Sequence, residues 1–293
     1  MTTVLVHGGA HTGRIRPERE EPIRAALREA AESGRAALAA GAGPVEAAVA
    51  AVVVLEDSEF FNAGYGAALN EDGEVELDAA VMDGATRRAG GVAVLTGYAN
   101  PVEVARSVLA DGRSVLLAGD GAARFAESAG FSRTRHLALV TRRRFRRWHR
   151  DQRAASHDTV GAVVCDAHGR LAAATSTGGP SLKAAGRVGD SPVPGAGVFA
   201  DDRSCAVSAS GAGERLLEAV AAHDVAARVS YLGVSVSEAV DAALAEVRGN
   251  AGLIAVDPEG KVGLAANTPL FRRALAVGND PVRVALLADD ELR

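Results

Sequence analysis

Apolar residues follow two different periods along the chain, and these periods predict a mixture of helices and strands. Between residues 17 and 40 they recur at steps of three and four, which is typical of an amphipathic helix. Pro44 opens a second, Ala- and Val-rich helix that extends to residue 55, because proline suits a first helical turn. Between residues 74 and 82 apolar residues alternate with others, so they share one face of a strand.

The same patterns predict the remaining elements of both halves. In the first half we expect strands over 3–6, 90–99 and 115–117, and helices over 101–109, with Asn100 as the cap, and 121–129. In the second half we expect strands over 160–166, 171–177, 205–210, 253–256 and 262–266, and helices over 211–228 and 236–247. Because strands and helices segregate within each half, the pattern favours stacked sheets covered by helices, an α+β layered fold.

Composition and charge narrow the class of protein. At 293 residues, with 48% hydrophobic and 4% aromatic residues, the chain has the composition of a globular protein whose core is mainly Ala, Val and Leu. A net charge of −5 does not suggest nucleic acid or an anionic membrane as a partner. We see no apolar stretch of about 18 residues and no signal peptide. Cys165 and Cys205 are expected to be buried free thiols, and the cytoplasm is the predicted compartment.

One segment departs from this composition. Seven arginines crowd together between residues 142 and 153, with Trp148 and His149 among them. A basic run with an aromatic residue is compatible with nucleic-acid binding. Because the run is short and lies in an acidic protein, we interpret residues 132–158 as an exposed, mobile linker between two halves.

Thr159 follows Asp158 at the start of an apolar, β-branched run and is the candidate nucleophile. A threonine hydroxyl needs an adjacent base at neutral pH. If the chain cuts itself at the Asp158–Thr159 bond, the freed α-amine of Thr159 supplies that base, since its reference pKa is about 7.7–8.0. The alternative is that Thr159 only begins a strand, where threonine is common.

Three further polar clusters lie at predicted strand ends or in a neighbouring loop. Thr177 ends the strand that forms a hairpin with the one after Thr159, so its hydroxyl can lie beside that residue. Arg187 and Asp190 could bind the carboxylate and the ammonium of a zwitterion, or form a surface ion pair. Residues 210–214 place a hydroxyl and backbone N–H groups at a helix start. This arrangement could bind an oxyanion, or it could be only a glycine-rich helix start.

Several ordered blocks together carry a family resemblance that no single motif would. They are residues 7–10, 61–64, 76–79 with 82–84, 158–161, 172–179, 186–192, 195–197 and 267–268. These blocks resemble the plant-type L-asparaginase/isoaspartyl peptidase family of N-terminal-nucleophile hydrolases. The resemblance implies a four-layer αββα sandwich that forms one domain over 1–293. It also implies self-cleavage into chains 1–158 and 159–293 and an assembly of two copies of each.

The resemblance also assigns roles within the site. Thr159 would be the nucleophile assisted by Thr177, Ser210 and Gly211 would form the oxyanion hole, and Asn62 would support the site. Arg187 and Asp190 would hold the α-carboxylate and α-amine of an aspartyl substrate, within a binding block that includes Gly189 and the backbone of Gly213. Catalysis would need no cofactor. A structural sodium ion would be held by backbone carbonyls of the 56–65 loop, which we assign to Glu56, Ser58, Phe61, Ala63 and Tyr65.

Two departures from the family pattern keep alternatives open. Ser210 stands where threonine is usual, and Asp158 stands where glycine is usual and resembles the related glycosylasparaginases instead. We therefore expect hydrolysis of L-asparagine or β-aspartyl dipeptides through a β-aspartyl ester on Thr159. A glycosylasparaginase-like amidase and a non-catalytic aspartyl-binding relative remain the alternatives.

Overall fold

The computed structural model describes residues 1–134 and 158–292, which form two β-sheets with helices packed against them. The α+β class expected from the sequence is confirmed. The arginine-rich run at 142–153 and most of the linker expected at 132–158 lie outside the described residues. Within the described ranges no helix is long and apolar enough to cross a membrane, and both cysteines are buried free thiols, as expected.

The larger sheet has eight strands in the order β12-β11-β1-β5-β6-β2-β3-β4, and all neighbours are antiparallel except β3 and β4. The smaller sheet is antiparallel, in the order β10-β9-β8-β7. The strands of the larger sheet are β1 (Thr3–His11), β2 (Leu77–Asp83), β3 (Ala89–Leu95), β4 (Leu116–Ala118), β5 (Val160–Cys165), β6 (Leu171–Thr177), β11 (Leu270–Val277) and β12 (Arg283–Leu287). Those of the smaller sheet are β7 (Val198–Ala200), β8 (Ala206–Gly211), β9 (Ala251–Val256) and β10 (Val262–Ala266).

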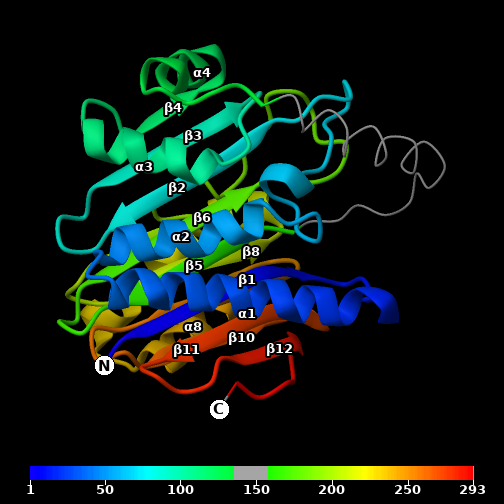
Figure 1. Ribbon diagram of the computed structural model, residues 1–293. Coiled ribbons are helices and arrows are strands. Elements are labelled where there is room, and N and C mark those ends of the chain that lie inside the picture. Colours follow the sequence, from blue (N-terminus) through cyan, green and yellow to red (C-terminus); the bar gives the residue numbers. More distant parts are fainter. Residues whose placement is uncertain (135–157, 293) are drawn as a thin grey trace.

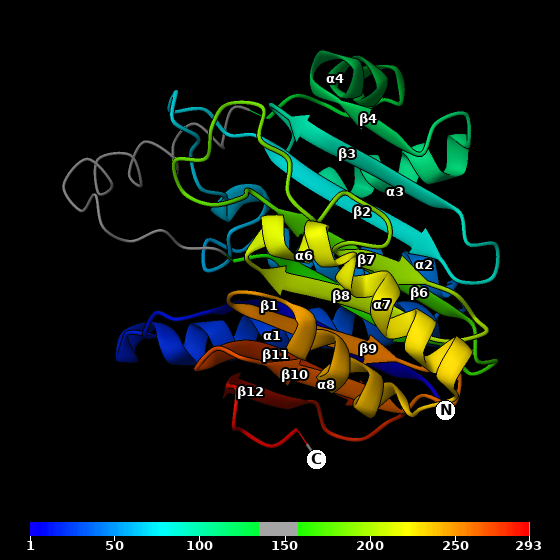
Figure 2. The same cartoon turned by 180° about the vertical axis from the view of Figure 1, so that it is seen from behind.

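Helices cover the outer face of each sheet. α1 (Pro17–Ala39), α2 (Pro44–Glu56) and α3 (Pro101–Asp111) lie across the larger sheet in Figure 1, and α4 (Gly119–Ser128) packs beside β3 and β4. On the opposite side of the molecule, shown in Figure 2, lie α6 (Gly213–Ala219), α7 (Ala221–Ala227) and α8 (Val236–Glu246), with α7 and α8 packed on the smaller sheet. The described residues also include two short helical turns, η1 (Gly64–Gly66) and the π-helical η2 (Arg228–Leu232).

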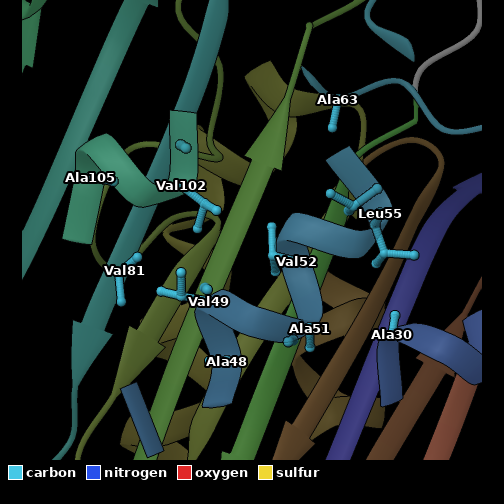
Figure 3. Packing of buried hydrophobic residues seen from close by; sticks show 14 of the residues in the cluster. Ala30, Ala48, Val49, Ala51, Val52, Leu55, Ala63, Val81, Val102 and Ala105 are labelled. Carbon is cyan, nitrogen blue, oxygen red and sulfur yellow. The ribbon is translucent and has the colours of Figure 1, made fainter. Parts of the chain in front are cut away.

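The central strands of the larger sheet are buried on both faces, so they contribute to two hydrophobic cores. Leu77, Ala79 and Val81 of β2 belong to the core beneath α1, α2 and α3, which confirms the predicted alternation. Ala80 and Met82, which alternate with them, belong to the core that joins the two sheets. Figure 3 shows the first core, where Val49 of α2 lies beside Val81 of β2, and Leu55 lies at the opposite end of α2, toward Ala63. Small aliphatic side chains fill both cores, as the low aromatic content predicts.

The helix expected over 211–228 is wrong in its extent. It is divided into α6 and α7 at Val220, whose φ of 48° lies in the left-handed region that β-branched residues rarely adopt. The apolar periodicity continues across the break, so the sequence pattern does not reveal it.

Three strands were not expected at all, namely β7, β11 and β12. β7 has only three residues and follows a loop rich in glycine and proline. β11 contains two adjacent arginines, which are unusual in a buried strand. The Arg273 guanidinium is fully buried there because it donates to the carbonyls of four residues, namely Phe271, Leu287, Ala288 and Asp290.

Asn100 occupies the cap position of α3, but its side chain does not cap the helix. Its amide donates to Asp57 Oδ1 at 3.0 Å, and Glu56 Oε1 accepts the Val102 N–H at 3.1 Å instead. Burial raises the pKa of the Glu56 carboxyl well above its usual value. A side chain at the end of α2 therefore accepts a backbone N–H at the start of α3. A local capping pattern does not predict this contact.

Candidate active site

One narrow cavity brings together most of the predicted site residues. It is lined by Asp158, Thr159, Thr177, Gly179, Pro180, Arg187, Asp190, Ser191, Gly211 and Gly213. Of the predicted catalytic and substrate-binding residues, Asn62, Gly189 and Ser210 lie outside this lining, as does the 56–65 loop. The cavity has a volume of about 10 Å³, roughly enough for one water molecule. In the uncut chain it is therefore too small for an aspartyl substrate.

Thr159 lies at the entrance to β5, which is hydrogen-bonded between β1 and β6. Val160 pairs with Ser176, so the expected hairpin brings Thr177 alongside the Asp158–Thr159 bond. Thr177 Oγ1 donates to the Asp158 carbonyl oxygen at 3.1 Å and accepts the Gly179 N–H at 3.0 Å. A hydroxyl group thus contacts the oxygen on which charge would develop if Thr159 attacked this carbonyl.

Asn62 supports the loop that follows Thr177 without lining the cavity. Its side-chain amide donates to the Gly179 carbonyl at 2.6 Å, and its Oδ1 accepts the Ala68 N–H at 2.6 Å. Its own carbonyl accepts the Gly178 N–H at 2.9 Å. Two of these hydrogen bonds hold residues 178–179 in place, and the third ties Asn62 to Ala68.

Ser210 and Gly211 end β8 beside the cavity. Ser210 is fully buried, and its Oγ accepts the Ala10 N–H at 3.0 Å, which leaves the hydroxyl hydrogen to donate elsewhere. Gly211 lines the cavity with a φ of 144°, and a Cβ there would lie 2.2 Å from the Asn250 carbonyl oxygen. Only glycine fits this position, because any side chain would collide with the neighbouring backbone.

Arg187 and Asp190 face the cavity with opposite charges, but they do not form the surface ion pair considered above. Arg187 Nε donates to Glu214 Oε1 at 2.8 Å, so the guanidinium is paired with a carboxylate in the first turn of α6. Asp190 is only 3% exposed. Burial raises the pKa of its carboxyl to about 7, although the nearby Arg187 charge opposes this shift. A buried carboxylate beside a cavity needs a cation, so a ligand ammonium would stabilise its charged form.

Two glycines allow these charged groups to lie close together. A Cβ at Gly213 would lie 2.6 Å from Arg187 Nη2 and 2.9 Å from Asp190 Oδ1. A Cβ at Gly189 would lie 2.7 Å from Arg187 Nη1. Gly213 therefore leaves space between the arginine and the aspartate, whereas Gly189 allows the guanidinium to pack against the backbone.

Buried charges behind the site were not found from the sequence. Lys183 is fully buried in its side chain, and its Nζ donates to the Glu76 carbonyl at 3.1 Å and lies 3.7 Å from Asp78 Oδ2. The Glu76 carboxylate accepts the Gly186 N–H at 3.0 Å. Burial lowers the pKa of Lys183 and raises that of Asp78. These contacts tie β2 to the loop that carries Arg187. Glu76 and Asp78 belong to one of the sequence blocks that carry the resemblance, but the sequence around Lys183 does not indicate that it pairs with them.

Asp158 is also held by residues that no sequence pattern indicated. Its Oδ2 lies 2.7 Å from Arg272 Nη2, and its Oδ1 lies 3.8 Å from His11 Nε2. Burial lowers the pKa of His11, and this shift is opposed by the Asp158 charge. The residue before the candidate nucleophile is therefore anchored through its side chain as well as through its carbonyl.

Three backbone oxygens of the 56–65 loop lie close to Gly64 or Gly66. A Cβ at Gly66 would lie 1.9 Å from the Phe61 carbonyl oxygen and 2.7 Å from that of Ser58. A Cβ at Gly64 would lie 2.6 Å from the Glu56 carbonyl oxygen. Oxygen-only donors suit hard cations. Side-chain clusters of three or more His, Cys, Asp or Glu that could hold a metal are absent from residues 1–134 and 158–292.

Comparison with known proteins is consistent with this geometry. The sequence profile of the family described as asparaginase matches residues 1–285. An isoaspartyl peptidase from Salmonella typhimurium is 41% identical, over 94% of this chain and 96% of that protein. The Escherichia coli isoaspartyl peptidase is 40% identical over 94% and 93%, and a plant-type L-asparaginase from Pyrobaculum calidifontis is 40% identical over 95% and 96%.

Proposed function

The chain belongs to the asparaginase family, and we propose that it is an N-terminal-threonine amidohydrolase acting on L-asparagine and β-aspartyl dipeptides. The observation that carries the proposal is the single cavity in which Thr159 faces both Arg187 and Asp190. A site with a cation and a buried anion suits the two α-groups of an aspartyl substrate. The relatives named isoaspartyl peptidase and L-asparaginase support the same substrate class.

Self-cleavage would convert the chain into its active form. Thr159 Oγ attacks the Asp158 carbonyl carbon, and the Thr177 hydroxyl stabilises the charge on the carbonyl oxygen. The amide becomes an ester as the nitrogen of Thr159 leaves and takes a proton, and water then hydrolyses the ester. The products are chains 1–158 and 159–293, which we propose remain one domain with the αββα sandwich of N-terminal-nucleophile hydrolases.

Catalysis by the cut form would use the same hydroxyl. Arg187 would bind the substrate α-carboxylate and Asp190 the α-ammonium, which presents the β-carbonyl to Thr159. The free amine of Thr159 takes the hydroxyl proton and passes it to the leaving ammonia or peptide amine. Ser210 and Gly211 would stabilise the oxyanion, and water would release aspartate from the resulting β-aspartyl ester. An ordinary α-aspartyl peptide would be rejected, because its peptide bond is formed by the α-carboxyl group and its free carboxylate is at the β-position. The group presented to Thr159 would then be a carboxylate, not an amide.

Three further assignments complete the proposal. The carbonyls of the 56–65 loop would hold a sodium ion with a structural rather than catalytic role. The approach of the Ser58 and Phe61 carbonyl oxygens to Gly66, and of the Glu56 carbonyl oxygen to Gly64, supports this assignment. The cut protein would assemble from two copies of each chain. The two buried free thiols suit a reducing compartment, and we place the protein in the cytoplasm.

A fragment measurement combined with a substrate panel tests this function. Denaturing mass spectrometry of purified protein should give two chains that separate at Asp158–Thr159. The cut protein should release aspartate from β-aspartyl-leucine and ammonia from L-asparagine. Faster turnover of N4-(N-acetylglucosaminyl)-asparagine than of both would instead identify a glycosylasparaginase, and cut protein that turns over none of the three would refute the proposed activity.

Asp190 should make binding of aspartyl ligands weaken at acidic pH. Its pKa is raised to about 7 by burial, so below pH 7 the carboxyl is increasingly protonated and cannot pair with an ammonium. The inhibition constant of L-aspartate should therefore increase about tenfold for each pH unit below 7. Competition assays between pH 5 and 8 measure this dependence.

Succinate is the matched control because it lacks the amine. Its inhibition constant should not worsen as the pH falls, since protonation of Asp190 removes a repulsive charge. Asp190→Asn should abolish the steep dependence for L-aspartate. If L-aspartate and succinate respond to pH in the same way, Asp190 does not bind the ammonium.

A further inference from the structure

We propose that Arg272 is a positioning residue for self-cleavage, holding the side chain of Asp158 so that the carbonyl to be attacked stays in place. The inference rests on the self-cleavage reaction proposed above. Arg272 lies on β11, and Asp158 lies just before β5. The two residues are 114 positions apart in the sequence, so only the fold brings them together.

Arg272 has the burial and the charge that an anchor needs. Its side chain is 4% exposed, and its Nη2 lies 2.7 Å from Asp158 Oδ2, whose side chain is 8% exposed. The same guanidinium donates through Nη1 to the Phe60 carbonyl at 3.3 Å and lies over the Phe61 ring, 5.2 Å from its centroid. The guanidinium is therefore fixed independently of Asp158, and an ion pair with little exposure to water is screened weakly.

The approach of the two charges depends on Gly9 of β1. A Cβ at Gly9 would lie 2.9 Å from Arg272 Nη2 and 3.0 Å from both Asp158 Cβ and Asp158 Oδ1. The φ of Gly9 is 106°, which disfavours a side chain in any case. β1 thus leaves a gap through which Arg272 reaches the residue before the cut.

Residue 158 is consequently held at two points. Arg272 holds its carboxylate, with His11 Nε2 3.8 Å from the other carboxylate oxygen, and Thr177 holds its carbonyl oxygen at 3.1 Å. One contact alone leaves rotation about the remaining backbone and side-chain bonds. Two contacts on opposite ends of the residue fix the plane of the carbonyl that Thr159 Oγ must approach. A displacement of about 1 Å at a reacting centre can reduce a rate about 10²-fold.

The experiment measures the rate at which the full-length chain is converted to chains 1–158 and 159–293. Arg272→Gln and Asp158→Asn should each slow conversion about 10–100-fold. The double variant should be no slower than the slower single variant, since both substitutions break one contact. Arg272→Lys should be intermediate, because it keeps the charge but loses the planar guanidinium. Freshly translated protein followed by denaturing mass spectrometry gives these rates.

Arg273→Gln is the matched control for a general loss of stability. Arg273 is the next residue of β11 and is also buried. It donates to the carbonyls of Phe271, Leu287, Ala288 and Asp290, none of which lines the cavity. It should lower the melting temperature while the folded protein still converts at close to the wild-type rate. Should Arg272→Gln fail to fold, Asp158→Asn and the lysine variant still test the contact.

The outcomes separate this inference from the proposed function. Wild-type protein that cuts itself, with Arg272→Gln and Asp158→Asn converting equally fast, would overturn the role of Arg272 alone. If Arg273→Gln slows conversion as much as Arg272→Gln does, the effect reflects general stability, and the positioning role of Arg272 is also overturned. A wild-type chain that stays whole yet hydrolyses aspartyl amides would refute self-cleavage, and the positioning role with it.

Discussion

Thr159→Ala is expected to give a full-length chain that neither cuts itself nor hydrolyses aspartyl amides. The substitution removes the only atom that our scheme uses as nucleophile in both reactions. Activity should fall by at least about 10⁴-fold, as is usual when a covalent nucleophile is lost. Without the cut the cavity also keeps its volume of about 10 Å³, too small for the substrate. Denaturing mass spectrometry and an assay with β-aspartyl-leucine measure the two effects.

Thr159→Ser is the control, because it keeps the hydroxyl and removes only the methyl group. We expect this variant to cut itself and to retain measurable activity, at a reduced rate because the serine side chain is less restricted in χ1. Cleavage at residue 158 in the alanine variant, or turnover close to that of wild type, would show that another group is the nucleophile.

Arg187→Met is expected to lower kcat/KM for β-aspartyl dipeptides by about 10²–10³-fold. Removing one partner of a buried, hydrogen-bonded charge pair costs about 2–5 kcal/mol, and here the lost pair would be that between the guanidinium and the substrate carboxylate. Glu214 accepts from Nε in the free protein, which leaves the two terminal nitrogens to face the cavity. Steady-state kinetics on fully cut protein measure the effect.

Two companion variants distinguish the guanidinium from its surroundings. Arg187→Lys should recover little activity, since an ammonium cannot make two parallel hydrogen bonds to a carboxylate. Glu214→Gln should cost less than about tenfold, because Glu214 is 62% exposed in its side chain and its ion pair with Arg187 is partly screened. If Arg187→Met keeps kcat/KM within threefold of wild type, the substrate carboxylate binds elsewhere.

Elements with strong local signals were predictable from the sequence. α1 and α2 begin at Pro17 and Pro44 as expected and end within one residue of the predicted positions, because periodicity and proline act locally. β6 coincides with its prediction, and β5 ends one residue earlier. The break at Val220 and the strand β11 were missed because the conformation of Val220 and the burial of two arginines depend on tertiary contacts.

The candidate site divides in the same way. Its hydroxyls, glycines and cavity-facing charges stand in sequence blocks that could be recognised one by one. The groups that hold these residues could not be predicted from the sequence. Lys183 contacts Glu76, and Arg272 contacts Asp158, only when β2 and β11 have joined the sheet. The pairing of Arg187 with Glu214 likewise depends on where α6 lies. Chemistry-bearing residues can thus be proposed from pattern, whereas their supports require the fold.

The strand order of the larger sheet determines what cutting the chain would do to the molecule. β5 and β6, which follow the bond, lie between β1 and β2, which precede it, and β11 and β12 lie on the far side of β1. The two products would therefore be interleaved and could not dissociate without breaking several rows of backbone hydrogen bonds. A nicked protein of this kind should unfold in one cooperative transition, and its halves, expressed separately, should be insoluble unless they are refolded together.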